Sequence, residues 1–223
     1  MVFIFVFINF SIILPKKGMN ELLNDIKRLK NIADIGLLYA KDEFDRERYT
    51  ELHEISLKLL SQLTDTPLSK ITNFYSPQTD YPTPKVDIRA LVMNDANQIL
   101  LARESSDGRW SLPGGWADIG LTASEVAVKE VFEETGLTVS PTRLLAVFDK
   151  KCHPHPPQAF YVYKFVILCQ WISGDLKPAH DILDTRFFDI NALPPLSENR
   201  ILKSQIELVF KKVQSNDNEA YFD

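Results

Sequence analysis

Residues 114–137 read GGWADIGLTASEVAVKEVFEETGL, and this segment is the most informative part of the chain about its fold. Two glycines open it, the apolar spacing predicts a helix from Ala123 to Thr135, and Gly136 is placed to end that helix in a left-handed turn. Thr122 and Glu125 have the spacing of a capping box, which satisfies free N–H groups at a helix start. The segment therefore predicts a glycine loop followed by one helix of about four turns.

Three acidic residues of this helix, Glu130, Glu133 and Glu134, are expected on one side of it, because successive residues advance by about 100°. A separate apolar arc is expected from Ala127, Val128, Val131 and Phe132. Carboxylates that lie close together repel one another when ionised, unless a bound cation offsets their charge. Mg²⁺ is the expected cation because it prefers hard oxygen ligands. Taken alone, a run of this kind is more often a solvated acidic face, so the glycines before it matter.

With its fixed distances the segment resembles the Nudix signature, G-x5-E-x7-R-E-U-x-E-E-x-G-U, where U is a bulky apolar residue. Positions at the required spacing are Gly115, Glu130, Val131, Glu133, Glu134, Gly136 and Leu137. Two positions depart, since Leu121 stands where a glutamate is expected and Lys129 stands where an arginine is expected. We expect Lys129 to pair with Glu125 one helical turn away.

The resemblance implies a fold and a chemistry. The expected fold class is α+β, a Nudix α/β/α sandwich with a mixed sheet, preceded by a small all-α N-terminal domain. The implied cofactor is Mg²⁺, with Mn²⁺ as a substitute, held by Glu130 and Glu134 with Glu133 nearby. The same three glutamates are the implied catalytic residues, with the acid and base roles among them left open.

The resemblance extends to a bacterial Nudix subgroup through Tyr81 to Arg89 (YPTPKVDIR) and Gly114 to Asp118 (GGWAD). Members of that subgroup hydrolyse nucleoside diphosphates linked to another group, such as ADP-ribose or CDP-choline. This implies a Mg²⁺-dependent pyrophosphatase that releases a nucleoside monophosphate and a phosphorylated second product. Two alternatives remain: a catalytically weakened nucleotide-binding sensor, or an enzyme that acts on nucleoside triphosphates or on the 5′ end of RNA.

The N-terminal part of the chain has a helical period. Helices are predicted from Asn20 to Leu38, from Asp45 to Leu63 and shortly after Pro67, which gives a helical domain over residues 19–75. Such a thin unit would bury its apolar stripe by dimerisation, so we expect a homodimer. Residues 76–84, rich in proline, are the expected linker.

Residues 85–215 are the expected Nudix domain. A hairpin is predicted from Val86–Met93 and Gln98–Arg103, and a final helix from Ser197 to Val213. Further strands are predicted at Arg143–Phe148, Ala159–Cys169 and Thr185–Ile190.

Substrate-binding candidates surround the signature. The glycine loop, Gly114 and Gly115, leaves the backbone open to a phosphate. Arg89 and Arg103, on the predicted hairpin, are candidate phosphate ligands, and Trp116 and Phe160 are candidate base-stacking residues or ordinary core residues. The loop from Asp149 to Gln158 carries Lys150, Lys151, His153 and His155 and is predicted to be a mobile flap over an anionic substrate. A zinc site at the two histidines is not expected, because zinc would need a third ligand that the sequence lacks nearby.

Composition limits the partners. The chain has 223 residues, 45% of them apolar, and a net charge of -5, which disfavours binding to nucleic acid. Its two cysteines, Cys152 and Cys169, lack metal-ligand spacing and favour a reducing, cytoplasmic location. The apolar run from Met1 to Leu14 is shorter than a membrane span, so residues 1–18 are interpreted as an extension outside the fold, with a membrane anchor as the alternative.

Overall fold

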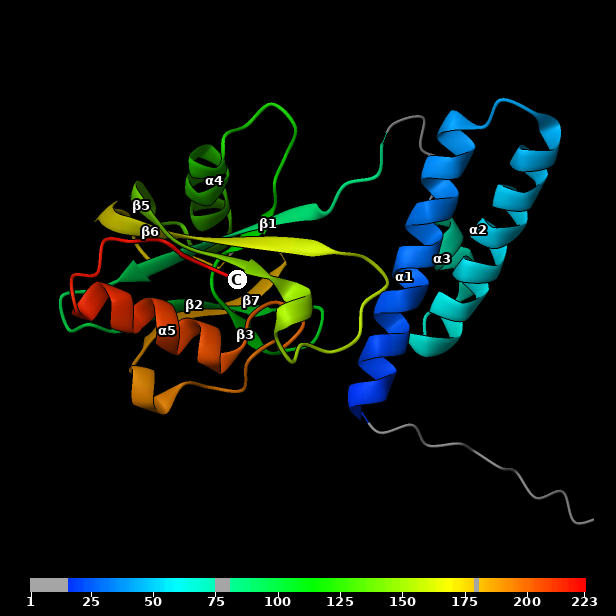
Figure 1. Ribbon diagram of the computed structural model, residues 1–223. Coiled ribbons are helices and arrows are strands. Elements are labelled where there is room, and N and C mark those ends of the chain that lie inside the picture. The colour runs from blue at the N-terminus through cyan, green and yellow to red at the C-terminus, as the bar shows by residue number, and fades with distance from the viewer. Residues whose placement is uncertain (1–15, 75–80, 179–180) are drawn as a thin grey trace, which may run out of the picture. The chain divides into compact units, whose positions relative to one another are not determined.

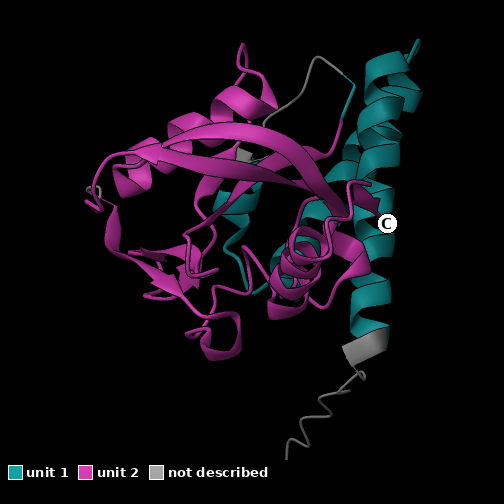
Figure 2. Ribbon diagram, turned by 90° about the vertical axis from the view of Figure 1, so that its left-hand side faces the viewer, with its two compact units in different colours: residues 1–82 teal, residues 83–223 magenta. Residues whose placement is uncertain are grey.

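The computed structural model describes residues 16–74, 81–178 and 181–223. The chain divides into two compact units, residues 1–82 and 83–223 (Figure 2). Most of the expected extension and of the expected linker lies outside the described residues. The first helix begins at Lys16, four residues before the predicted start at Asn20, so it includes the last residues of the expected extension.

Three helices form the N-terminal unit: α1 (Lys16–Tyr39), α2 (Glu43–Leu63) and α3 (Leu68–Phe74). Asp42 caps α2 by accepting a hydrogen bond from the N–H of Asp45, so the helix begins two residues earlier than predicted. A β-carbon on Gly36 would lie 2.4 Å from the ring of Tyr49, so glycine lets α1 and α2 approach closely. The apolar residues buried in this unit are Leu23, Ile26, Ala33, Leu57, Leu60 and Ile71.

The described strands of the second unit form one eight-stranded mixed sheet in the order β3-β2-β1-β6-β5-β8, with β4 paired to β1 and β7 paired to β2. The strands are β1 (Lys85–Met93), β2 (Ile99–Glu104), β3 (Trp110–Ser111), β4 (Gly114–Trp116), β5 (Thr138–Asp149), β6 (Val162–Ser173), β7 (Ile182–Phe188) and β8 (Tyr221–Phe222). Strands β1 and β6 run parallel, as do β5 and β8, and the remaining pairs are antiparallel.

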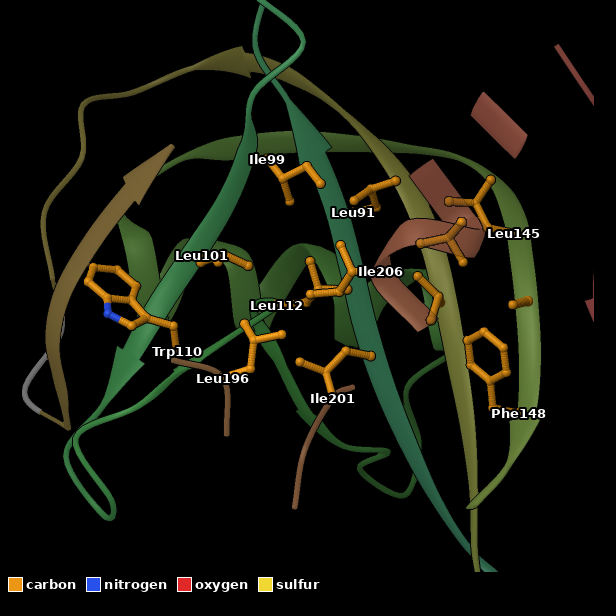
Figure 3. Packing of buried hydrophobic residues seen from close by; sticks show 13 residues of the cluster. Leu91, Ile99, Leu101, Trp110, Leu112, Leu145, Phe148, Leu196, Ile201 and Ile206 are labelled. Atoms are coloured by element: carbon orange, nitrogen blue, oxygen red, sulfur yellow. The ribbon is translucent and has the colours of Figure 1, made fainter. Parts of the chain in front are cut away.

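Helices α4 (Ala123–Thr135) and α5 (Lys203–Gln214) lie on opposite faces of this sheet (Figure 1). Strand β1 is buried on both faces: Ile88 and Ala90 belong to the core beneath α4, while Leu91 belongs to the core beneath α5 (Figure 3). The predicted fold, an α/β/α sandwich with a mixed sheet after a helical N-terminal region, is confirmed.

Some boundaries differ from the prediction. Helix α5 begins at Lys203 and not at Ser197, because the Ser197 hydroxyl donates to Asp107, in a loop beside β2, and the backbone turns there. Residues 197–202 form a loop that the site uses. Strand β5 is longer than predicted, and β3, β4 and β8 are too short to give a periodic signal. Along the described chain, no helix has the length and apolar character to cross a membrane.

Candidate active site

The capping residues of α4 hold it as the sequence predicts. Thr122 and Glu125 form the capping box, with Thr122 N–H donating to the Glu125 carboxylate at 2.7 Å, and Gly136 ends the helix at a φ of 76°. The buried apolar face consists of Val126, Ala127 and Val131. Phe132 is 58% exposed, so its predicted place in the apolar arc is wrong. The helix is turned so that Glu134 lies on the buried side.

A tight turn sets the glycine loop against β1. A β-carbon on Gly114 would lie 2.0 Å from the carbonyl oxygen of Ile88, and its φ of 145° also favours glycine. A β-carbon on Gly115 would lie 2.9 Å from the carboxyl group of Glu130. The absence of side chains therefore leaves room for a carboxylate beside the loop.

Glu130 and Glu134 line one pocket with this loop. The carboxylate of Glu134 accepts a hydrogen bond from the N–H of Gly114 at 3.1 Å. Burial raises the pKa of Glu134 to about 8, against the lowering effect of Arg89, and burial also raises the pKa of Glu130. One buried and one half-buried acid that both resist ionisation in the same pocket form a suitable site for a cation.

Glu133 is more exposed than these two and is outside the described pocket lining, although it shares Lys129 with Glu130. Its side chain is 54% exposed and its Oε2 is 3.0 Å from Nζ of Lys129. Lys129 does not pair with Glu125, contrary to expectation, because Glu125 is engaged by Thr122. Lys129 instead bridges α4 to the preceding loop through Asp118, at 3.4 Å. Leu121, the other departure from the signature, is 40% exposed and is outside the described lining of the pocket.

The pocket has a volume of about 470 Å³. Acidic and basic side chains share its wall, which suits a phosphate ester bound together with a cation. Its lining is Asp87, Arg89, Glu104, Gly114, Gly115, Trp116, Asp118, Lys129, Glu130, Glu134, Lys150, Gln158, Val162, Asp181, Asn199 and Arg200.

The two candidate arginines differ in position. Arg89 is 5% exposed, lines the pocket and donates from Nη1 to the carbonyl oxygen of Leu112 at 3.1 Å. Arg103 is exposed and donates from Nε to the carbonyl oxygen of Gly108 at 2.8 Å, away from the described pocket lining. The structure therefore brings only Arg89 to the glutamates.

The histidines of the basic loop are held elsewhere. His155 donates from Nδ1 to the carbonyl oxygen of Glu198 at 2.6 Å, and His153 pairs with Asp223 at 2.9 Å. Neither belongs to the pocket lining among the described residues. Lys150, by contrast, reaches the pocket and donates to Gln158 and to the carbonyl oxygen of Asn199. These bonds join the loop to neighbouring segments, and the mobility predicted for it stays a prediction.

Several charged residues of the wall were not predicted from the sequence, and Glu104 and Arg200 are two of them. Glu104 ends β2, and Arg200 lies in the loop before α5, with Nε 2.9 Å from Oε1 of Glu104. Burial raises the pKa of Glu104 although Arg200 lowers it. They come from segments about a hundred residues apart, so only the sheet brings them together, and no local pattern marks them.

Aromatic residues flank the glycine loop. Trp116 is 48% exposed, lines the pocket and packs edge-on against Phe160 with 5.8 Å between ring centroids. The ammonium of Lys85 lies 5.5 Å from the centroid of Trp116. Trp116 therefore offers the pocket a half-exposed aromatic surface with positive charge beside it.

The donor set fits a magnesium-type cation. The described residues contain no group of three or more His, Cys, Asp or Glu side chains that could hold a metal ion. Mg²⁺ needs fewer, since it is commonly bound by one or two carboxylates together with water and substrate phosphates. Glu134 supplies a buried carboxylate and Glu130 a half-buried one, and the room beside Gly115 keeps that of Glu130 accessible.

Comparison with known proteins matches this architecture. Residues 83–209 match the model of the NUDIX domain, which is more than half of the chain. The chain belongs to the Nudix family. As a Nudix hydrolase it is an enzyme, and hydrolases of this family generally use divalent cations such as Mg²⁺. Residues 20–75 match a domain described as UDP-X-like, N-terminal oligomerisation domain.

Individual relatives cover both units. The Bacillus subtilis (strain 168) protein named "Putative ADP-ribose pyrophosphatase YjhB" is 40% identical over 93% of this chain and 99% of its own length. A solved UDP-X diphosphatase is 36% identical, with a TM-score of 0.59, over 92% of this chain and 99% of its own. An ADP-ribose pyrophosphatase structure from Streptococcus suis is 38% identical, with a TM-score of 0.57, over 63% of this chain and all of its own. This Nudix hydrolase is thus similar to ADP-ribose pyrophosphatases and to a UDP-X diphosphatase.

Proposed function

We propose that the protein hydrolyses the diphosphate bond of a nucleoside diphosphate linked to another group, with ADP-ribose or CDP-choline as the substrate type. The products are a nucleoside monophosphate and a phosphorylated second product. The observation that carries this proposal is the placement of half-buried Glu130 and buried Glu134 beside the glycine loop, in a pocket that also holds Arg89, Lys150 and Arg200. The names of the full-length relatives favour a diphosphate over a triphosphate substrate.

A Mg²⁺ ion bound by Glu130 and Glu134 would neutralise the diphosphate and make a bound water more acidic. Without a cation, burial keeps the pKa of both glutamates raised, so cation binding and loss of their protons should be coupled. For Glu133 we propose a supporting role, because it holds Lys129 and through it the loop at Asp118.

The remaining residues bind and orient the substrate. Arg89, beneath the glycine loop, offers its guanidinium to the phosphate oxygens, and Lys150 adds positive charge on the same wall. Trp116 offers a half-exposed ring to the base or to the ribose. We leave Arg103, His153 and His155 out of the substrate site, since their side chains are engaged elsewhere.

The test is a substrate panel analysed by chromatography for released monophosphate. ADP-ribose, CDP-choline, UDP-sugars and nucleoside triphosphates are compared in Mg²⁺ and in Mn²⁺. We expect turnover of at least one linked diphosphate that exceeds triphosphate turnover by at least about tenfold. Turnover of triphosphates alone, or equal turnover in excess EDTA, would contradict the proposal.

We also propose that the protein is a homodimer formed through the N-terminal unit. The match to an oligomerisation domain supports this, and α1 carries the exposed apolar residues Leu22, Leu29 and Ile32. An exposed apolar stripe on a small helical unit is stabilised by burial against a second copy.

A further inference from the structure

A buried lysine that no motif marks lies on β6, beside the strand that carries Asp87 and Arg89. Lys164 of β6 is 1% exposed, and the parallel pairing of β1 with β6 sets it beside Asp87. Its ammonium forms an ion pair with Oδ2 of Asp87. Burial lowers the pKa of Lys164 to about 8, which reflects the cost of keeping an ammonium group there. A lysine retained at such a cost suggests a role beyond filling space.

Asp87 is shared between two cations. Nε of Arg89 donates to Oδ1 of Asp87 at 3.0 Å, and Nη2 of Arg89 is also 3.0 Å from Oδ1. Lys164 occupies the other oxygen, Oδ2. Nε of Arg89 also donates to Oδ2 at 3.3 Å, so Arg89 and Lys164 compete for that oxygen. Arg89 therefore has only part of the Asp87 carboxylate available to it.

The far side of Arg89 is anchored to the turn before the glycine loop. Nη1 donates to the carbonyl oxygen of Leu112 at 3.1 Å and faces the hydroxyl of Ser111 at 3.4 Å. Nη2 makes its ion contact with Asp87 but donates no hydrogen bond to any residue in the described part of the chain. Since a guanidinium carries five N–H groups, hydrogen-bonding capacity remains on Nη2 for a ligand in the pocket.

We propose that Lys164 is a positioning residue for the substrate diphosphate. By donating to Oδ2 of Asp87, Lys164 competes with Arg89 for that carboxylate and weakens the hold of Asp87 on the guanidinium. The cluster of one carboxylate and two cations then keeps one positive charge under the glycine loop, with Nη2 directed to a phosphate oxygen. This inference rests on the proposed function only in that a diphosphate occupies the pocket.

The experiment measures the binding of ADP in EDTA by calorimetry, together with kcat and KM for the best substrate in Mg²⁺. In Lys164→Met, ADP binding is expected to weaken about tenfold and KM to rise by a similar factor, while kcat changes less than about threefold. Arg89→Lys retains the positive charge but loses the planar set of guanidinium N–H donors, and it should weaken ADP binding by a similar factor.

The double variant K164M/R89K decides the mechanism. If Lys164 acts through Arg89, the double variant should bind ADP about as weakly as R89K alone, whereas independent effects would multiply to roughly a hundredfold. Val166→Ala, a buried change on the same strand, is the matched control and should lower the melting temperature without changing ADP affinity. Multiplied effects, or K164M affinity within twofold of wild type, would overturn the proposal.

A second substitution covers poor folding of K164M. Lys164→Gln keeps a donor for Asp87, so it should lose less ADP affinity than R89K and should be non-additive with it. If the wild-type protein binds ADP in EDTA but hydrolyses no substrate of the panel, the proposed function is wrong and this inference can still be tested. Wild type that binds no ADP at millimolar concentration would sink the inference itself.

Discussion

Glu134 and Gly114 are joined by a hydrogen bond of 3.1 Å, from the backbone N–H of the glycine to the carboxylate. The bond ties α4 to the short strand β4, which pairs with β1 at Arg89. Gly114 itself has no room for a side chain, because a β-carbon would collide with the carbonyl oxygen of Ile88. The acidic helix, the glycine loop and the arginine strand are therefore one rigid unit, and each part can be tested separately.

Removing the charge of Glu134 should abolish most activity. Glu134→Gln keeps an acceptor for Gly114 N–H but loses the anion, so kcat/KM is expected to fall by at least about 100-fold in Mg²⁺. The matched control is Glu125→Gln on the same helix, whose side chain can still accept from Thr122. Steady-state kinetics of both variants check this. A loss in E125Q equal to that in E134Q would point to helix stability and not to the site.

A methyl group at Gly115 should displace Glu130 without unfolding the protein. The collision is with the carboxyl end of a flexible side chain, which can move, and the backbone is not touched. We expect Gly115→Ala to raise the Mg²⁺ concentration for half-maximal activity about tenfold, with a melting temperature within a few degrees of wild type.

Gly120→Ala is the contrasting variant for Gly115. A β-carbon there meets nothing within 4 Å, but the φ of 93° strains any other residue. It should cost about 1 kcal/mol of stability and leave the Mg²⁺ requirement unchanged. Equal metal dependence in the two alanine variants would mean that the space beside Glu130 has no role.

The sequence predicted the parts of this site that depend on local contacts. The capping box, the left-handed Gly136 and both ends of α4 follow from interactions between residues at most four apart. The facing wall was predicted only in part: the basic loop with Lys150 was expected near the substrate, whereas Glu104 and Arg200 come from distant segments that the sheet brings together. The final helix was predicted to begin at Ser197, yet the Ser197 hydroxyl donates to Asp107, a contact that depends on tertiary structure.

The burial of His155 should make stability depend on pH. Burial lowers its pKa to about 4, with Lys150 and Lys164 adding to the effect, while an unfolded histidine titrates near 6.5. The unfolded state therefore binds more protons between these values, so stability is complete above about pH 6.5 and is lost as the pH falls toward 4. Protonation would also give Nε2 a hydrogen in a place where no described residue accepts it.

Urea unfolding at pH 7 and pH 4.5 measures this dependence. His155→Gln keeps a donor for the carbonyl of Glu198 but does not titrate. The loss of stability between the two pH values should be smaller in H155Q than in wild type by about 2–3 kcal/mol. Identical losses in the two proteins would show that other groups set the acid sensitivity.

The N-terminal unit should control assembly and not the chemistry of each chain. Charging the exposed stripe of α1 in the double variant L29K/I32K is expected to reduce the mass in solution from about 51 kDa, twice the 25.5 kDa of one chain, to that of the monomer. Thr50→Lys, at an exposed polar position of α2, is the control and should remain dimeric.

Light scattering gives the mass, and kinetics at matched chain concentration give the activity. All described residues that line the pocket belong to residues 83–223, so kcat per chain should stay within about threefold in the L29K/I32K monomer. A monomer with kcat reduced 100-fold would mean that the second copy completes the site. A dimer that survives both lysines would move the interface away from this face of α1.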